Sequence, residues 1–291
     1  MTDYGAQHMS ARLERVMMRR PGPSFADADP ALWHYGAQFD PARAADQHAR
    51  FTALVEASGA RIEWLEDRGD GLADAVFTHD PSLVTARGAI VLRMGKALRA
   101  GEPALHESKY RELGIPIAAR IAAPGTVEGG DCLWLDPQTL LIGRGVRTNQ
   151  AGIEQMRQLL EAQGVEVHAF DLPLWQGEAA CLHLLSVISP LAPDLALVFA
   201  PLLPVALFQL LRARGIRLIE APPEEFAASG GLSLNVLPTE PRRLIAVAGF
   251  PATRAAMQAA GCEVETFEAD ALCIACEGGP TCLTRPIERR T

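Results

Sequence analysis

A helical segment that ends in glycine and runs directly into a short strand occurs five times along this chain of 291 residues. The five glycines are Gly59, Gly114, Gly164, Gly215 and Gly261, and they lie 46 to 55 residues apart. Glycine ends helices because it adopts the left-handed backbone conformation without the steric cost of a Cβ atom. After each glycine the apolar residues change from helical spacing toward the alternation of a strand. A repeat of mixed helix and strand leaves few architectures open to the chain.

Each unit also contains a run of apolar residues typical of a buried strand. These runs cover residues 88–92, 139–142, 196–199 and 244–247. Five regularly spaced units favour an α/β fold that closes into a five-bladed propeller with pseudo-fivefold symmetry. An open α/β sheet is the alternative, since helix-glycine-strand junctions are also common there. In the ring, an N-terminal strand at about residues 12–18 would complete the last unit, and residues 1–291 would form a single domain.

Composition excludes several classes of protein. The formal charge of −8 and the lack of a Lys/Arg cluster argue against nucleic-acid binding and suit a cationic small molecule. The N-terminus has no basic segment followed by an apolar core, so we expect a cytoplasmic protein without a secretory signal. The most apolar stretch, 191–211, is interrupted by an aspartate and several prolines. It is therefore interpreted as a buried strand, a turn and the start of a helix, with no membrane span.

The six cysteines are expected to be reduced, because a chain of this length does not need disulfides for stability. Cys273 and Cys276 have the spacing of zinc ligands, but no second pair of ligands follows them. The segment 271–276 is instead interpreted as a buried strand in which the thiols act as small hydrophobic groups. We therefore expect no metal at these two cysteines.

Reactive side chains recur at similar places in the five units. Asp80, His183, Asn235 and Cys282 follow their repeat glycines by 21, 19, 20 and 21 residues, and Glu128 follows its glycine by 14. The first unit also contains Asp74, Phe77 and His79. Because the units would converge at the centre of a ring, these side chains are predicted to meet there.

Their chemistry is that of nucleophilic catalysis. A cysteine becomes an effective nucleophile when a base or a positive field yields its thiolate. A histidine moves protons to and from attacking and departing groups, and a carboxylate behind it stabilises its charged form. Further carboxylates bind a planar guanidinium through paired hydrogen bonds. Taken singly, Glu128-Gly-Gly-Asp131 could be only a turn, His183 a core histidine, and Cys282 a structural thiol.

At this point the chain resembles the pentein superfamily, specifically dimethylarginine dimethylaminohydrolases and their amidinotransferase and arginine deiminase relatives. The resemblance runs from about Val16 to Arg285. It is carried by several short segments in a fixed order, which are 16–21, 74–80, 99–102, 124–131, 147–149, 182–184 and 278–283.

The resemblance implies a five-bladed propeller with a central active site and no cofactor. It implies that Cys282 is the nucleophile, His183 the general acid and base, and Glu128 the partner of the histidine. It also implies a set of substrate-binding residues: Asp80 for the guanidinium, Arg99 and Arg147 for the α-carboxylate, and Asp74 for the α-amino group, with Phe77, His79 and Leu185 nearby. The reaction would form a covalent thiouronium intermediate and end in a ureido product plus an amine or ammonia.

Two positions depart from the family pattern. His79 stands where dimethylargininases usually have glutamate, and Leu185 stands where the family has lysine or aspartate. If His183 and Leu185 share one face of a strand, one wall of the pocket is apolar. The leading hypothesis is a hydrolase acting on an arginine-like cationic amino acid, which could be N-methylated. An amidinotransferase, an arginine deiminase and a non-catalytic amino-acid-binding protein are the alternatives, with a homodimer as one option for assembly.

Overall fold

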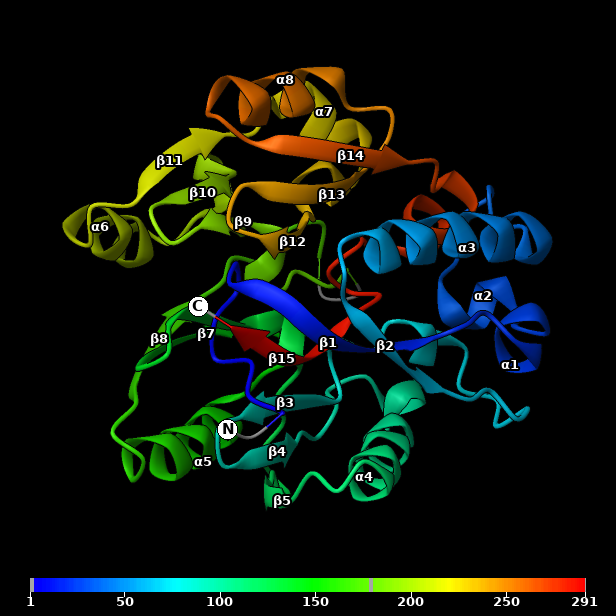
Figure 1. Cartoon of the computed structure of the whole chain (residues 1–291), viewed down its shortest axis with the longest axis horizontal. Helices are drawn as coiled ribbons and strands as arrows, with labels where there is room; N and C mark the ends of the chain where they lie inside the picture. The colour runs from blue at the N-terminus through cyan, green and yellow to red at the C-terminus, as the bar shows by residue number, and fades with distance from the viewer. Residues whose placement is uncertain (1–2, 178–179, 291) are drawn as a thin grey trace.

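The computed structural model describes residues 3–177 and 180–290. It contains five three-stranded sheets, and in each sheet the middle strand pairs antiparallel with one neighbour and parallel with the other. Figure 1 shows the sheets around a common centre, with helices α3, α4, α5, α6 and α8 on the periphery. The predicted five-unit α/β propeller is therefore confirmed.

Four sheets follow one another along the chain. The first contains β3 (Ser82–Thr85), β4 (Gly88–Val91) and β5 (Ile117–Arg120), with α4 (Glu102–Glu112) in the crossover. The second contains β6 (Cys132–Asp136), β7 (Thr139–Arg144) and β8 (Glu166–Asp171), with α5 (Gln150–Glu161). The third contains β9 (Ile188–Ala192), β10 (Leu195–Val198) and β11 (Arg217–Glu220), with α6 (Val205–Ala213). The fourth contains β12 (Leu237–Glu240), β13 (Arg243–Val247) and β14 (Glu263–Phe267), with α8 (Pro251–Ala259).

The fifth sheet joins the two ends of the described chain. Its middle strand β1 (Arg12–Arg19) lies between β15 (Arg285–Arg290) and β2 (Arg61–Leu65). The crossover from β1 to β2 carries α3 (Pro41–Ala57), preceded by the short helices α1 (Pro23–Ala26) and α2 (Pro30–Trp33). The strand expected at about 12–18 corresponds to β1, which occupies the position that closes the ring.

Each repeat glycine lies between a crossover helix and the following strand. All five have positive φ angles, from 71° to 90°. This left-handed conformation ends the helix and turns the chain back along the sheet. The predicted junctions are therefore present at all five places.

The hydrophobic core is divided into five clusters, one at each interface between neighbouring sheets. The middle strands supply both sides, because alternate residues of a strand point to opposite faces. In β10, Leu195 and Leu197 pack toward the β12–β14 sheet, whereas Ala196 and Val198 pack toward the β6–β8 sheet. Burial on both faces explains why these strands are continuous apolar runs in the sequence.

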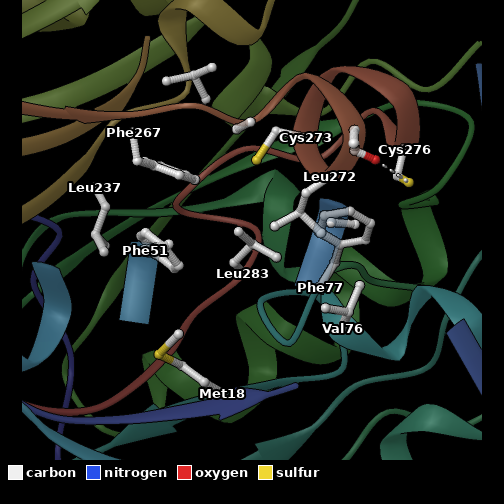
Figure 2. Close-up of a cluster of buried hydrophobic side chains, with 14 of the residues drawn as sticks. Met18, Phe51, Val76, Phe77, Leu237, Phe267, Leu272, Cys273, Cys276 and Leu283 are labelled. Atoms are coloured by element: carbon white, nitrogen blue, oxygen red, sulfur yellow. Dashed lines mark hydrogen bonds between the residues drawn. The ribbon is translucent and has the colours of Figure 1, made fainter. Parts of the chain in front are cut away.

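Two local predictions are wrong. Residues 271–276 were expected to form a strand, but Asp270–Ile274 is a π-helix that continues as a helical turn, in which Cys273 is buried. Figure 2 shows the Cys273 thiol within the apolar cluster near Leu272 and Phe267. Residues after His183 were also expected to be a strand, but Leu184–Ser186 forms a 3-10 turn. Small and apolar residues are compatible with either structure, so periodicity alone did not separate them.

Candidate active site

Polar side chains from all five units meet around one cavity of about 250 Å³. Four 3-10 turns precede the first strands of the four sequential sheets, at Ala73–Val76, Gly129–Asp131, Leu184–Ser186 and Leu232–Leu234. The fifth contribution is the segment before β15. The cavity is lined by Asp74, Phe77, Asp80, Arg99, Arg147, His183, Asn235 and Cys282, among others. A cavity of this size suits a small molecule.

The backbone after Cys282 is fixed by the core. Leu283 is fully buried in the cluster between the β1–β2 and β12–β14 sheets (Figure 2). With its neighbour held in this way, Cys282 lies at the cavity, and its side chain is partly exposed. Its backbone carbonyl accepts a hydrogen bond of 3.0 Å from the amide of His79, which joins the last unit to the first.

The Cys282 thiol accepts a hydrogen bond of 3.2 Å from the Asn235 side-chain amide. The other end of that amide accepts a 2.9 Å hydrogen bond from the backbone of Thr281, which fixes its orientation. Burial and the negative charge of Asp80 raise the pKa of Cys282, whereas the Gly279 backbone, His183 and Asn235 lower it. The net result is a raised pKa, so the resting group at neutral pH is a thiol.

His183 and Glu128 form a close pair. Their Nε2 and Oε2 atoms lie 2.8 Å apart, and Glu128 is fully buried. Burial opposes the charge on His183, but Cys181, Asp131 and Asp80 together raise the pKa of the imidazole well above its usual value. Burial likewise opposes the charge on Glu128, but its hydrogen bond to His183 lowers the pKa of the carboxyl to about 2. The site therefore holds an imidazolium against a carboxylate.

Asp80 is fixed on the cavity wall by two strong interactions. One oxygen accepts a 2.8 Å hydrogen bond from the Gly130 amide, and the other lies 2.6 Å from Arg99 Nη1. Burial acts against its charge, but Arg99 and His183 lower the pKa of Asp80 below its usual range. A permanently ionised carboxylate at the cavity can bind a cation.

Arg99 lines the cavity and is also bound to several groups of the protein. Its Nε and Nη2 atoms bind both oxygens of Glu102 at 2.8 Å, and Nη2 also donates to the Phe77 carbonyl at 3.0 Å. Together with the bond to Asp80, these contacts engage all three of its nitrogens inside the protein. These contacts fix Asp80, and a role of Arg99 at a substrate carboxylate stays a prediction.

Asp74 and Arg147 also line the cavity. Asp74 accepts hydrogen bonds from Tyr35 at 2.9 Å and from Lys96 at 2.6 Å. Arg147 lines the cavity with its Nη1 atom 3.5 Å from Glu128 Oε1, at the outer limit of a hydrogen bond. Arg147 therefore stays available to an anionic group of a ligand.

Two of the residues predicted to bind substrate do not line this cavity. His79 is buried behind it, with Nδ1 2.9 Å from the Thr284 carbonyl, and faces a small separate cavity beside Arg285. Leu185 packs in the core between the β6–β8 and β9–β11 sheets. In the 3-10 turn, residues two apart do not share a face, so it is Ser186 and not Leu185 that lines the cavity with His183.

Four residues at the site were not assigned a role from the sequence. They are Tyr35, Lys96, Cys181 and Asn235. Asn235 carried a signal, because it has the same offset from its repeat glycine as Cys282 has from its own, within one residue. Lys96 and Tyr35 carried none, since their roles depend on contacts with distant segments.

Cys181 lies beside the catalytic pair, with its Sγ atom 3.4 Å from His183 Nε2. Donor atoms of Glu128, Cys181 and His183 all lie within 4.8 Å of one another. Sulfur, imidazole and carboxylate are donors that divalent metals accept. The same histidine nitrogen is already bonded to Glu128, so a metal would have to replace that hydrogen bond.

The chain resembles known proteins along nearly its full length. Residues 70–214 match the arginine deiminase family model. The chain is 29% identical to N(G),N(G)-dimethylarginine dimethylaminohydrolase of Pseudomonas aeruginosa over 93% of this chain and 98% of that protein. It is 34% identical to the enzyme of the same name from Streptomyces coelicolor over 62% of this chain and 66% of that protein.

Solved structures give the same result for the fold. A mutant of the Pseudomonas aeruginosa enzyme complexed with citrulline has a TM-score of 0.76 at 26% identity, covering 94% of this chain and 99% of that chain. An amidinotransferase from Microseira wollei in the saxitoxin biosynthetic pathway has a TM-score of 0.79 at 18% identity, covering 99% and 98%. The second likeness concerns the fold alone. In the part of the chain that the structure describes, no helix is both long and apolar enough to cross a membrane.

Proposed function

Because the chain belongs to the pentein superfamily, with dimethylarginine dimethylaminohydrolases and arginine deiminases among its relatives, we propose that it hydrolyses the guanidino group of an arginine-like small molecule. The observation that carries the proposal is one cavity lined by a thiol, an imidazolium and an ionised carboxylate from three different units. A cytoplasmic location and a homodimer stay predictions from the sequence.

Asp80 would bind the guanidinium next to Cys282. The resting thiol has a raised pKa, partly because of the negative charge of Asp80. A bound cation offsets that charge and adds a positive field, so it favours the thiolate when substrate is present. The nucleophile would then form only beside its target.

Cys282 would lose its proton to solvent, because His183 is already protonated, and the thiolate would attack the central guanidinium carbon, forming a C–S bond and a tetrahedral adduct. The C–N bond to the departing amine breaks as His183 gives that nitrogen a proton. Water then attacks the remaining thiouronium carbon while the neutral imidazole accepts its proton. Collapse of this adduct breaks the C–S bond, and the departing sulfur takes the proton of the adduct's hydroxyl group, which restores the thiol and releases a ureido product. Throughout, Glu128 would hold the imidazole and stabilise its charged form.

The experiment combines turnover with trapping. The intact protein is given arginine, its N-methylated forms and shorter guanidino compounds, and ureido product and released amine are measured. Separately, 2-chloroacetamidine is used to alkylate the protein, and the modified cysteine is identified by mass spectrometry. We expect ureido product and modification at Cys282, with both lost in Cys282→Ser.

Cys262→Ser is the matched control, because Cys262 lies between α8 and β14 and does not line the cavity. This variant should retain turnover and labelling. Lack of ureido product from every guanidino compound, together with lack of labelling at Cys282, would refute the proposal. Product formation that depends strictly on an added amine would assign the chain to the amidinotransferases.

A further inference from the structure

The acidic group that could receive an α-ammonium is already paired within the protein. One oxygen of Asp74 accepts from the Tyr35 hydroxyl at 2.9 Å, and the other lies 2.6 Å from Lys96 Nζ. The Asp74 and Lys96 side chains are only 9% and 17% exposed, so the ion pair is largely shielded from solvent. An ammonium group of a ligand would have to compete with a protein cation at this position.

Lys96 is held in place by three contacts. Its backbone amide donates to Glu128 Oε1 at 3.0 Å, as does that of Gly95 at 2.9 Å. Its ammonium lies 5.2 Å from the centre of the Trp33 ring, within the range of a cation–π interaction. The carboxylate that supports His183 thus also fixes the backbone of Lys96. Its position is set by the fold, unlike that of a freely moving surface lysine.

The charged side chains that line the cavity form two groups. In the first, Asp80 presents an ionised carboxylate in the same cavity as Cys282, and this charge matches a guanidinium. In the second, Asp74 is paired with Lys96, and Glu128 is paired with His183, so the positive charge of Arg147, 3.5 Å from Glu128, is only partly balanced. A carboxylate matches that charge, whereas an ammonium would be repelled by two cations. Glu277 also borders the cavity, but its side chain is exposed and its charge is screened by water.

We propose that the preferred substrate is an ω-guanidino carboxylate, in which a short chain joins the guanidinium to a carboxylate and no ammonium group is present. Lys96 and Arg147 bind the carboxylate, and the Lys96–Asp74 pair occupies the place where an amino acid would put its ammonium. This inference rests on the proposed function and narrows its substrate class.

Three compounds with the same guanidinium group test which charged groups the substrate carries at its other end. Arginine carries both charged groups, 5-guanidinopentanoate lacks only the amino group, and agmatine lacks only the carboxylate. We expect kcat/KM for 5-guanidinopentanoate to exceed that for arginine by about 10-fold or more, on the order of a single mismatched charge or hydrogen bond. Agmatine should be the poorest of the three. N-methylated arginines should show the same disadvantage relative to 5-guanidinopentanoate as arginine does, since they carry the same amino and carboxylate groups.

Protection from alkylation gives a readout that does not require turnover. Each compound is titrated against labelling of Cys282 by 2-chloroacetamidine, and the same order of affinities is expected. If arginine or its methylated forms are turned over faster and bound more tightly than 5-guanidinopentanoate, the inferred preference for a substrate without an ammonium group is wrong, while the proposed function stands. If no compound gives ureido product or protects, and Cys282 is not labelled, the proposed function itself fails.

Two variants test which residue sets the preference for 5-guanidinopentanoate over arginine. Lys96→Met keeps the unbranched stem of the side chain as far as the ε position and removes the ammonium, so it should raise KM for 5-guanidinopentanoate by about 10-fold, with little change in kcat. The same change frees Asp74 and should narrow or reverse the preference over arginine. Glu277→Gln should leave the preference unchanged. A selective loss of arginine use in Glu277→Gln would assign the ammonium to Glu277 and overturn the inference.

Discussion

Glycine occurs both at the outer helix–strand junctions of the ring and in its inner turns, for two different physical reasons. At the outer glycines Gly114, Gly164, Gly215 and Gly261, φ is positive and an added Cβ would meet nothing within 4 Å. At the inner Gly130, φ is ordinary, but an added Cβ would lie 2.5 Å from His183 Nδ1. The outer glycines provide a backbone conformation, whereas the inner one provides space for a neighbouring side chain.

This difference shows how one repeat supports both a fold and a unique site. The outer positions are equivalent, so each stabilises its own junction and little else. The inner positions differ from unit to unit, because each turn places a different side chain at the cavity. Changes at the two regions should therefore separate stability from catalysis.

Gly130→Ala is expected to have the largest effect. The new methyl group would displace the His183 ring, which packs closely against it, and a displacement of about 1 Å in catalytic geometry costs about 100-fold in rate. Steady-state turnover and circular dichroism would show a lower kcat in a folded protein. An unchanged kcat would mean that the position of the imidazole is not set by this turn.

His48, on the outer helix α3, gives a prediction about acid stability. Burial, followed by the charge of Arg20, lowers its pKa to about 4, so the native state keeps it neutral. The unfolded chain takes up a proton near pH 6.5, and stability from this group is therefore lost as pH falls from 6.5 toward 4. Between pH 7 and pH 5 the loss amounts to about 2 kcal/mol.

The check is the difference between wild type and His48→Gln in urea unfolding at the two pH values. Glu102 and Asp131 act in the opposite direction, because burial raises the pKa values of their carboxyls to about 7 and about 6. They are present in both proteins and cancel in the comparison. Relative to wild type, the variant should gain about 2 kcal/mol on going to pH 5. A difference that does not change with pH would contradict the assigned shift.

Gly164→Ala is expected to have the smallest effect, and it is the counterpart of Gly130→Ala. At a φ of 77° an alanine costs about 1 kcal/mol of folding free energy, and no neighbour is displaced. Thermal unfolding should show the loss, while kcat stays at the wild-type value. A large fall in kcat would show that the outer junctions are coupled to the cavity.

The same contrast explains what could be predicted from the sequence. The junctions depend on local signals, namely helical spacing, a glycine and an alternating strand, and all five were found. The inner turns depend on contacts between units. Leu185 was assigned to a strand because alternation is ambiguous over four residues, and only the fold shows that it faces the core.

Charged partners were equally hard to predict, because they come from distant parts of the chain. Arg99 was expected at the substrate, and its ion pairs with Asp80 and Glu102 were not predicted. Lys96 meets Asp74, which is 22 residues away, only because the turn before β3 and the segment after β4 converge. Residue types at the site were thus predictable from their offsets, and their pairing was not.

The sheet formed by β15, β1 and β2 has a consequence for biosynthesis. β1 leaves the ribosome early, yet its partner β15 is made more than 260 residues later, and Cys282 stands just before β15. One edge of β1 therefore stays unpaired while the other four sheets are synthesised. An unpaired strand edge can pair wrongly with other strands during this time. Pairing of β15 with β1 also brings the sulfur to its place, so the site forms only after the other four sheets have been made.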